Sequence, residues 1–205
     1  MGREQILERL RTARATVTVP RAEAPAPAPV VRRPLHECAE RFLQEAAAVG
    51  IECWAESSAA DVRARVQSLV AGRRVLAWDP SELPYGVGDL VPGAALGRSP
   101  RREQALAEIG VTGCDAAIAE TGSLAMISAP GRSRIVSLLP PAHLAIVTAD
   151  RLTFSMAEFF ADRAGALRHA ASCTFITGPS RTADIELTLT LGIHGPGKVT
   201  IVLGP

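Results

Sequence analysis

The 205-residue sequence predicts an α/β domain with a mostly parallel sheet and helices on both of its faces. Short apolar segments alternate along the chain with segments of helical periodicity, which is typical of βαβ units. Hydrophobic residues make up 47% and charged residues 21% of the chain, as in ordinary globular proteins, so composition excludes a disordered chain. This length is sufficient for one domain with a short appendage.

Residues 1–33 form the expected appendage. Ile6, Leu7 and Leu10 recur at helical spacing and predict a short amphipathic helix. Alternating Ala and Pro over residues 24–29 predict an extended spacer, because proline fixes φ and removes the backbone donor. Two alternatives remain open: the helix folds back on its own domain, or it docks on a partner subunit.

The domain itself is expected over residues 34–205. Pro34 stands near the first position of a helix that Gly50 follows, and Gly72 follows a second helix. An apolar run that ends before Asp79 is typical of a buried parallel strand. In the first half we therefore expect helices over 35–49, 59–70 and 100–109, strands over 51–54 and 75–78, and mostly loop over 84–97.

The second half is richer in strands. Two apolar segments flank the turn Glu120–Ser123 and predict a β-hairpin, the one antiparallel element of the sheet. We expect strands over 116–119, 124–127, 135–139, 144–147, 173–177 and 199–203, and helices over 156–167 and 183–191.

Charge and cysteine content limit the function classes. Lys and Arg (22) balance Asp and Glu (21), so no field of one sign attracts nucleic acid or an anionic membrane. No apolar run is long enough to span a bilayer, and no secretory signal is evident, so we expect a cytoplasmic protein. The four cysteines are far apart and lack a C-x-x-C pair; we expect buried thiols and no metal site.

Glu120 is the first candidate for catalysis. It follows an apolar strand and shares a turn with Thr121 and Gly122. A carboxylate desolvated on one side can serve as a general base or a nucleophile. Alternatively, Glu120 and Asp115 accept hydrogen bonds from N–H groups of turns.

Residues 177–186 are the second candidate region, for anion binding. They connect an expected strand to an expected helix, where α/β sheets place ligands. Backbone N–H groups at the helix start would bind a carboxylate or phosphate. A structural cap, with Arg181 paired to Asp184 or Glu186, is the alternative. The candidate anion-binding residues here are Gly178, Ser180, Arg181 and Thr182.

The turn 129–134 presents Arg132 and Arg134, whose guanidinium groups suit carboxylates and phosphates unless they are merely solvated. His143 is a weaker candidate for proton transfer, because a lone histidine is more often structural. We expect the three polar loops to meet at one cleft.

Three stretches together resemble the LUD domain of the lactate utilization protein C family. They are GVTGCDAAIAETGS (110–123), GRSRIVSLLPPAH (131–143), and GPSRTADIE (178–186) with His194-Gly195-Pro196. The resemblance covers residues 35–205, and the short N-terminal helix with its Pro/Ala linker also fits the family.

The resemblance implies a fold of the sugar-phosphate isomerase/CoA-transferase-like group. It also implies a role in oxidising L-lactate to pyruvate together with two iron–sulfur subunits. This chain lacks ferredoxin-like cysteine motifs, so we expect no cofactor in it and iron–sulfur clusters in its partners alone.

Three functional hypotheses follow. The first is a non-redox subunit of a lactate-oxidising complex that binds a small carboxylate. The second is an independent enzyme of the CoA-transferase or cyclo-ligase type, acting on an acyl or phosphorylated substrate. The third is an assembly module without chemistry. Homo-oligomerisation is left open.

Overall fold

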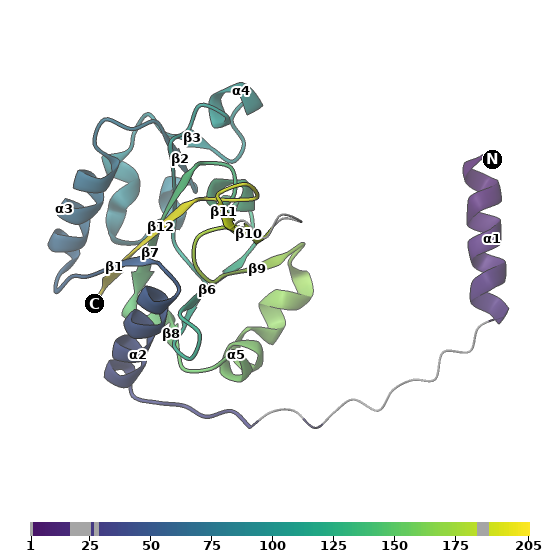
Figure 1. The fold of residues 1–205 in the computed structure, drawn as a ribbon, viewed down its shortest axis with the longest axis horizontal. Helices are drawn as coiled ribbons and strands as arrows, with labels where there is room; N and C mark the ends of the chain where they lie inside the picture. The colour runs from purple at the N-terminus through teal and green to yellow at the C-terminus, as the bar shows by residue number, and fades with distance from the viewer. Residues whose placement is uncertain (1, 17–25, 27–28, 184–188) are drawn as a thin grey trace.

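The computed structural model describes residues 2–16, 26, 29–183 and 189–205. Its centre is a six-stranded sheet in the order β1-β12-β7-β4-β2-β3, and all five strand pairs are parallel (Figure 1). This confirms the predicted α/β class. The six strands are β1 (Glu52–Ala55), β2 (Val75–Ala77), β3 (Ala95–Leu96), β4 (Ile109–Thr112), β7 (Ala142–Thr148) and β12 (Lys198–Gly204).

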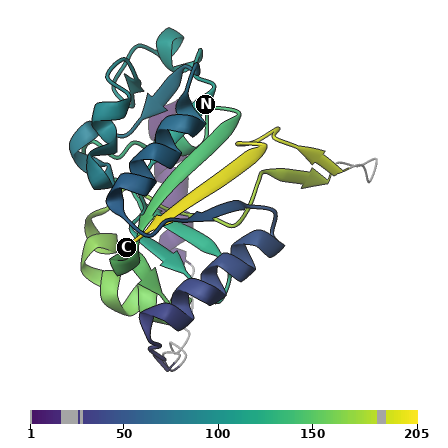
Figure 2. The same ribbon diagram turned by 90° about the vertical axis from the view of Figure 1, so that its left-hand side faces the viewer.

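A second sheet of four strands, in the order β8-β5-β6-β9, contains the predicted hairpin. β5 and β6 pair antiparallel, as expected, while β8 joins β5 in parallel. A separate two-stranded ribbon of β10 and β11 projects from the domain (Figure 2). These strands are β5 (Ala116–Ile118), β6 (Ser123–Ile127), β8 (Leu152–Thr153), β9 (Cys173–Ile176), β10 (Arg181–Ala183) and β11 (Leu189–Leu191).

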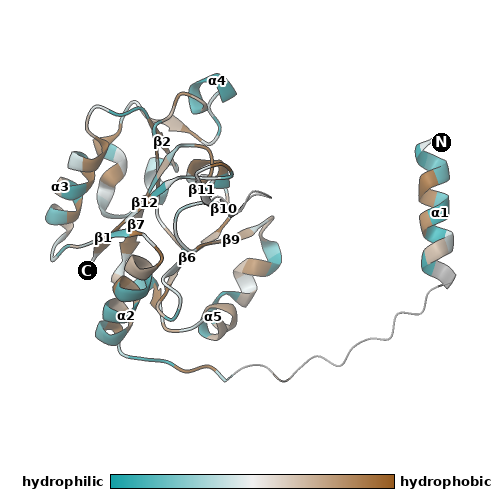
Figure 3. Ribbon diagram, viewed as in Figure 1, coloured by the Kyte–Doolittle hydropathy of each residue, from teal (hydrophilic) through white to brown (hydrophobic). Residues whose placement is uncertain are grey.

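Helices cover both faces of the large sheet. α3 (Ala59–Val70) and the 3-10 helix η2 (Pro84–Leu90) pack on one face. α2 (Leu35–Ala48) and the second sheet pack on the other, and α5 (Met156–His169) covers the outer face of the second sheet. Hydrophobic residues accordingly concentrate on the central strands β7 and β12 (Figure 3).

Local sequence explains where the helices begin. The hydroxyl of Ser58 accepts a hydrogen bond from the backbone N–H of Asp61 and caps α3. Ser155 caps α5 in the same way through the N–H of Glu158, and the Glu158 carboxylate accepts the N–H of Phe154. This reciprocal arrangement is a variant of the capping box.

Helix α2 lies directly against the hairpin turn. Gly122 has φ +63°, and a Cβ built on it would lie 2.3 Å from the backbone nitrogen of Ala46. The turn and the helix therefore approach more closely than any side chain at this position would allow.

Two predicted elements in the middle of the chain are wrong, the helix 100–109 and the strand 135–139. The segment 100–109 forms only a short helix, α4 (Arg101–Gln104), followed by β4. Gly110, expected to end a helix, lies within β4, where a Cβ would be 1.9 Å from the carbonyl oxygen of Val136. The segment 135–139 forms the 3-10 helix η3 (Arg134–Ser137) instead of a strand, because β4 and β7 already have neighbours on both sides.

The predicted helix 183–191 is also wrong. Its described ends belong to β10 and β11, which pair antiparallel, and residues 184–188 lie outside the described residues. The alternation Leu189-Thr190-Leu191 has the two-residue period of a strand. A smaller difference concerns 84–97, which contains η2 and β3 as well as loop.

The N-terminal helix α1 (Arg3–Thr16) is present as predicted and lies away from the domain in Figure 1. Ile6 is 43% exposed and Leu10 is 60% exposed, so the domain does not bury this apolar stripe. None of the helices among the described residues combines the length and hydrophobicity needed to cross a bilayer.

The close contact at the hairpin turn predicts a large stability cost for Gly122→Ala. The new Cβ meets the backbone of α2 and forces a positive φ on alanine, so we expect a loss of about 2–4 kcal/mol in the free energy of unfolding. Denaturant titration measures this loss.

Gly165→Ala is the matched control. A Cβ on Gly165 of α5 meets nothing within 4 Å, so this substitution is expected to be neutral or stabilising. Equal effects of the two substitutions would contradict the proposed contact.

Candidate functional site

The carboxyl ends of β2, β4 and β7 meet at one edge of the large sheet, where ligands bind in open α/β folds. The loops after these strands, with the 3-10 helices η1 (Pro80–Glu82) and η4 (Ala149–Arg151), enclose a cavity of about 340 Å³. Its lining comprises Ser81, Glu82, Leu83, Pro84, Gly113, Cys114, Ile146, Thr148, Asp150 and Arg151.

Asp115, which is buried, and Arg132, which is half-buried, form an ion pair beside this edge. The Arg132 Nη1 atom lies 2.6 Å from Asp115 Oδ1, and Asp115 Oδ2 accepts the backbone N–H of Ile127 at 2.6 Å. Glu82 Oε2 lies 3.3 Å from Arg132 Nε, although the geometry is not that of a hydrogen bond. Both carboxylates of this group therefore already neutralise Arg132.

The surrounding charge is acidic. Asp79 forms an ion pair with Arg98, and Arg132 also lies 6.0 Å from the ring centroid of Trp78. Asp79, Glu82 and Asp115 carry three negative charges against two from Arg98 and Arg132. A second anion is therefore disfavoured next to Arg132, in contrast to the prediction that this residue binds one.

Glu120 lies at the opposite end of the β5–β6 hairpin. Its Oε1 atom accepts the backbone N–H of Met156, at the start of α5, at 2.6 Å. Beside it, Ser123 Oγ accepts from the Thr121 hydroxyl at 2.8 Å and lies 2.6 Å from Thr177 Oγ1. These contacts support the alternative in which Glu120 accepts a backbone hydrogen bond.

Gly178 and Arg181 pack on the end of α2. Arg181 Nη2 donates to the carbonyl oxygen of Val49 at 3.1 Å, and the Gly178 backbone approaches the same carbonyl. Ser180 bonds through its backbone to Pro196 and Gly192. We predicted that the start of a helix here would bind an anion, but Arg181 and Thr182 lie in strand β10, so this helix start is absent from the described residues. The Thr182 side chain lies outside the described part of the chain.

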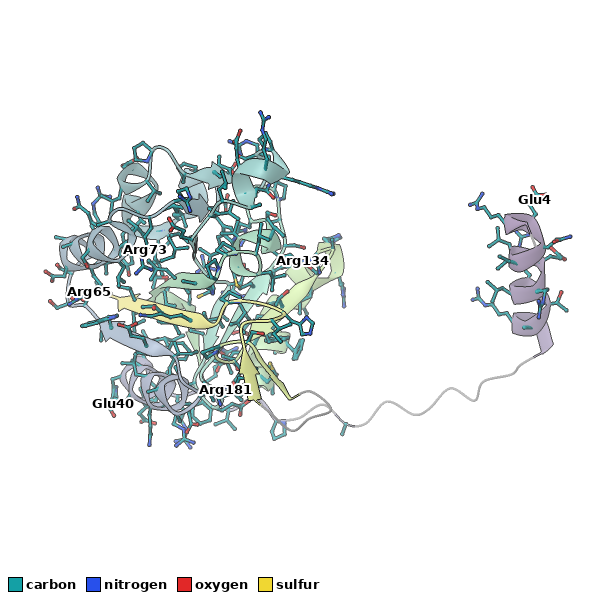
Figure 4. The ribbon with its side chains drawn as sticks, turned by 45° about the horizontal axis from the view of Figure 1, so that its top comes forward. Glu4, Glu40, Arg65, Arg73, Arg134 and Arg181 are labelled. Carbon is teal, nitrogen blue, oxygen red and sulfur yellow. The ribbon has the colours of Figure 1, made fainter. Side chains whose placement is uncertain are left out.

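Arg134 and His143 are separate again. Arg134 is exposed on η3, and Figure 4 shows it in a different part of the domain from Arg181. His143, 1% exposed, lies on the face of β7 that packs against α2 and the second sheet, and its Nε2 atom lies 2.8 Å from Thr112 Oγ1. Its Nδ1 atom has no hydrogen-bond partner among the described residues.

The predicted site residues therefore fall into separate places. Thr121, Gly122, Gly178 and Arg181 gather near the end of α2, whereas Arg132 lies at the far end of the hairpin. Ser133 packs on Gly97. The three loops do not share one cleft. Sequence reasoning missed Asp79, Glu82, Asp150 and Arg151, since turn carboxylates and arginines have no distinctive spacing.

The cysteines come from different elements, α2, β1, the loop after β4, and β9. Burial raises the pKa of Cys53 to about 11 and that of Cys114 to about 12. No group of three or more metal-ligating side chains occurs within the described part of the chain.

His143 predicts a specific pH dependence of stability. Burial lowers its pKa to about 4, so between about pH 6.5 and 4 the unfolded state binds a proton that the folded state does not. Stability therefore falls as the pH falls, and this residue contributes a loss of about 2 kcal/mol between pH 7 and pH 5. Urea titrations across this range measure the slope.

In His143→Gln this part of the slope disappears, because glutamine does not titrate. His36→Gln, on the exposed side of α2, is the control and keeps the wild-type slope. A slope that is unchanged in His143→Gln would show that His143 is not held neutral.

With this geometry established, comparisons with known proteins place the chain in a family. A family model described as the LUD domain matches residues 90–203. Lactate utilization protein C from Shouchella clausii is 34% identical over 146 residues, covering 66% of this chain and 64% of the relative. The protein of that name from Deinococcus radiodurans is 29% identical over 215 residues, covering 98% of this chain and 95% of the relative.

Coverage of other relatives is partial. The match to lactate utilization protein C from an Exiguobacterium species, at 44% identity, spans 46% of that protein's length. A crystal structure of a DUF162 family protein from Deinococcus radiodurans has the same fold, with a TM-score of 0.67 at 22% identity over 84% of this chain and 99% of that one. Lactate utilization protein C from a Geobacillus species is 30% identical over 169 residues, covering 72% of this chain and 70% of the relative. Because the LUD model also covers more than half of the chain, the chain belongs to the lactate utilization protein C family and contains its LUD domain.

Proposed function

We propose that this chain is a component of an L-lactate utilisation system, which oxidises lactate to pyruvate together with iron–sulfur subunits. The observation that carries the proposal is the similarity to lactate utilization protein C of Deinococcus radiodurans, which extends over 98% of this chain. The partners and the division of labour between subunits are part of the proposal.

Lactate oxidation converts a secondary hydroxyl to a ketone and releases two electrons and two protons. The proposal assigns the electrons to iron–sulfur partner subunits, because the cysteines here stand on four different elements and are not grouped as cluster ligands. The share of this chain is then to bind a small carboxylate through arginine side chains, whose planar forks match carboxylate oxygens.

The exposed apolar stripe of α1 supports an additional docking role. Ile6 and Leu10 lie on one face of a helix that the domain does not cover. An isolated helix of this length is marginal in water, so a partner surface would stabilise it. The hypothesis of an independent CoA-transferase-like enzyme has less support, because the backbone of α5 already engages the Glu120 carboxylate.

Deleting this chain from its host is expected to abolish growth on L-lactate while leaving growth on pyruvate intact. Pyruvate enters metabolism after the proposed oxidation, so only the first substrate depends on the system. Growth rate on each carbon source is the measurement, and a plasmid copy of the full chain restores growth on lactate.

Two results would contradict the proposed role. Undiminished growth of the deletion strain on L-lactate would show that lactate utilisation does not require the chain. Equal loss of growth on both substrates would place the function elsewhere in metabolism.

Glu120→Gln is expected to preserve growth on L-lactate and to lower stability by up to about 1 kcal/mol. Glutamine still accepts the hydrogen bond from Met156, but it loses the negative charge at the helix N-terminus. Complementation of the deletion strain and denaturant titration give the two readouts.

Glu40→Gln, an exposed carboxylate on α2, is the matched control and should change neither readout. Loss of growth on lactate in Glu120→Gln, with stability preserved, would contradict this expectation and show that the function requires the carboxylate.

A further inference from the structure

We propose that a second cavity, between the linker and α5, binds a small hydroxycarboxylate through Arg33, Arg151 and Thr153. This inference rests on the proposed function for the identity of the ligand, whereas the site itself follows from the structure.

The cavity has a volume of about 350 Å³, in the range of pockets for small metabolites. Residues from five segments line it: the linker, the start of α2, β5, the η4–β8 segment and α5. They are Arg32, Arg33, Leu35, Cys38, Ala116, Asp150, Arg151, Leu152, Thr153, Glu158, Phe159, Asp162 and Arg163.

Thr153 is a lining residue of the cavity that carries an unsatisfied polar atom. The residue is only 9% exposed, and its Oγ1 atom is buried without a hydrogen-bond partner among the described residues. A buried hydroxyl without a partner costs free energy, so a ligand oxygen that bonds to it is favoured. The larger cavity of about 660 Å³, near Arg73 and Leu106, does not contain this residue.

Arg33 and Arg151 supply donors for an anion. Arg33 Nη1 lies 4.0 Å from Glu37 Oε2, and Arg33 Cζ lies 5.5 Å from the ring centroid of Phe154. Arg151 Nε lies 3.5 Å from Asp150 Oδ2. In the described part of the chain, neither guanidinium group donates a hydrogen bond to these or other residues. Their N–H donors are therefore available to a ligand, although each guanidinium group also faces one carboxylate.

Arg32 attaches the linker segment before α2 to α5. Its guanidinium forms two bonds with Asp162, of 2.6 and 3.0 Å, and a third with Glu158 of 2.9 Å. These contacts fix the backbone next to Arg33 against α5. They also engage both α5 carboxylates, which weakens their repulsion of an anion but leaves one negative charge uncompensated.

The charges of the lining favour an anion only slightly. The lining carries four guanidinium groups, from Arg32, Arg33, Arg151 and Arg163, against three carboxylates, from Asp150, Glu158 and Asp162. Arg32 is occupied by the two carboxylates of α5. Arg163 is already directed to the backbone oxygen of Asp115, at 3.1 Å. Two guanidinium groups with unused hydrogen-bond donors, beside a threonine hydroxyl that has no partner among the described residues, suit a carboxylate that carries a hydroxyl group.

Calorimetric titration of the full-length protein tests the proposal with L-lactate, propionate and inorganic phosphate at constant ionic strength. L-Lactate is expected to bind, and Arg33→Met and Arg151→Met should each weaken its binding about tenfold or more, since each loses a charge-assisted bond. Propionate, which has the carboxylate but not the hydroxyl, reports on Thr153. Thr153→Val should weaken lactate binding severalfold and leave propionate binding unchanged.

Two controls test whether these effects belong to this cavity. Arg73→Met removes an exposed arginine at the larger cavity and should leave lactate binding unchanged. Thr153→Val should not lower the unfolding temperature without ligand, because Oγ1 makes no hydrogen bond to lose. A fall in stability without ligand would instead assign Thr153 a structural role and overturn its place in the site.

Other results would overturn the proposal. Absence of lactate binding, or an unchanged affinity in both Arg33→Met and Arg151→Met, would reject the cavity. Tighter binding of phosphate than of any carboxylate would reject the ligand class. If the deletion strain loses growth on lactate but the titrations show no binding, only the site is wrong. If binding is as expected but growth is unaffected, only the lactate role is wrong.

Discussion

Asp115 is the residue on which the arrangement of the two sheets depends. It follows β4 of the large sheet and directly precedes β5 of the second sheet. Its carboxylate bonds to the N–H of Ile127 and to Arg132, its N–H donates to Ala125, and its carbonyl accepts from Arg163 of α5. One residue thus connects both sheets, the loop with Arg132 and the outer helix. Removing Arg132 would leave the buried Asp115 carboxylate without its charged partner.

Small residues lie where the second sheet, α2 and the large sheet pack closely against one another. Alanine residues on β5 alternate between α5 on one side and α2 with the large sheet on the other. Gly122 brings the hairpin turn into contact with α2, and Gly110 brings β4 against η3. Small residues at these points let helix and sheet backbones pack with few voids, so substitutions here act on the relative position of whole elements.

Periodicity in the sequence predicted most of the domain but not the site. Val62, Val66 and Val70 mark the buried face of α3, and the apolar runs of β7 and β12 are buried as expected. Gly110 was misleading because a glycine required by a close backbone contact resembles one that ends a helix. Glu120 and Arg132 are near in sequence, yet they lie at opposite ends of strands that rise about 3.3 Å per residue.

The residues of the second cavity carry no local signal at all. Arg33 belongs to the linker, Arg151 to a 3-10 turn and Thr153 to a two-residue strand. None of these positions forms a motif with the others, because only the packing of α2, β8 and α5 brings them together. The charge balance of the whole chain, nearly neutral, also conceals a local excess of guanidinium groups.

The lengths of the strands have a consequence for self-association. The interior strands β7 and β12 have seven residues each, whereas the outermost strands β1 and β3 have four and two. These short edge strands present few unpaired backbone N–H and C=O groups, so they are poor templates for strand pairing between molecules and for amyloid-like growth.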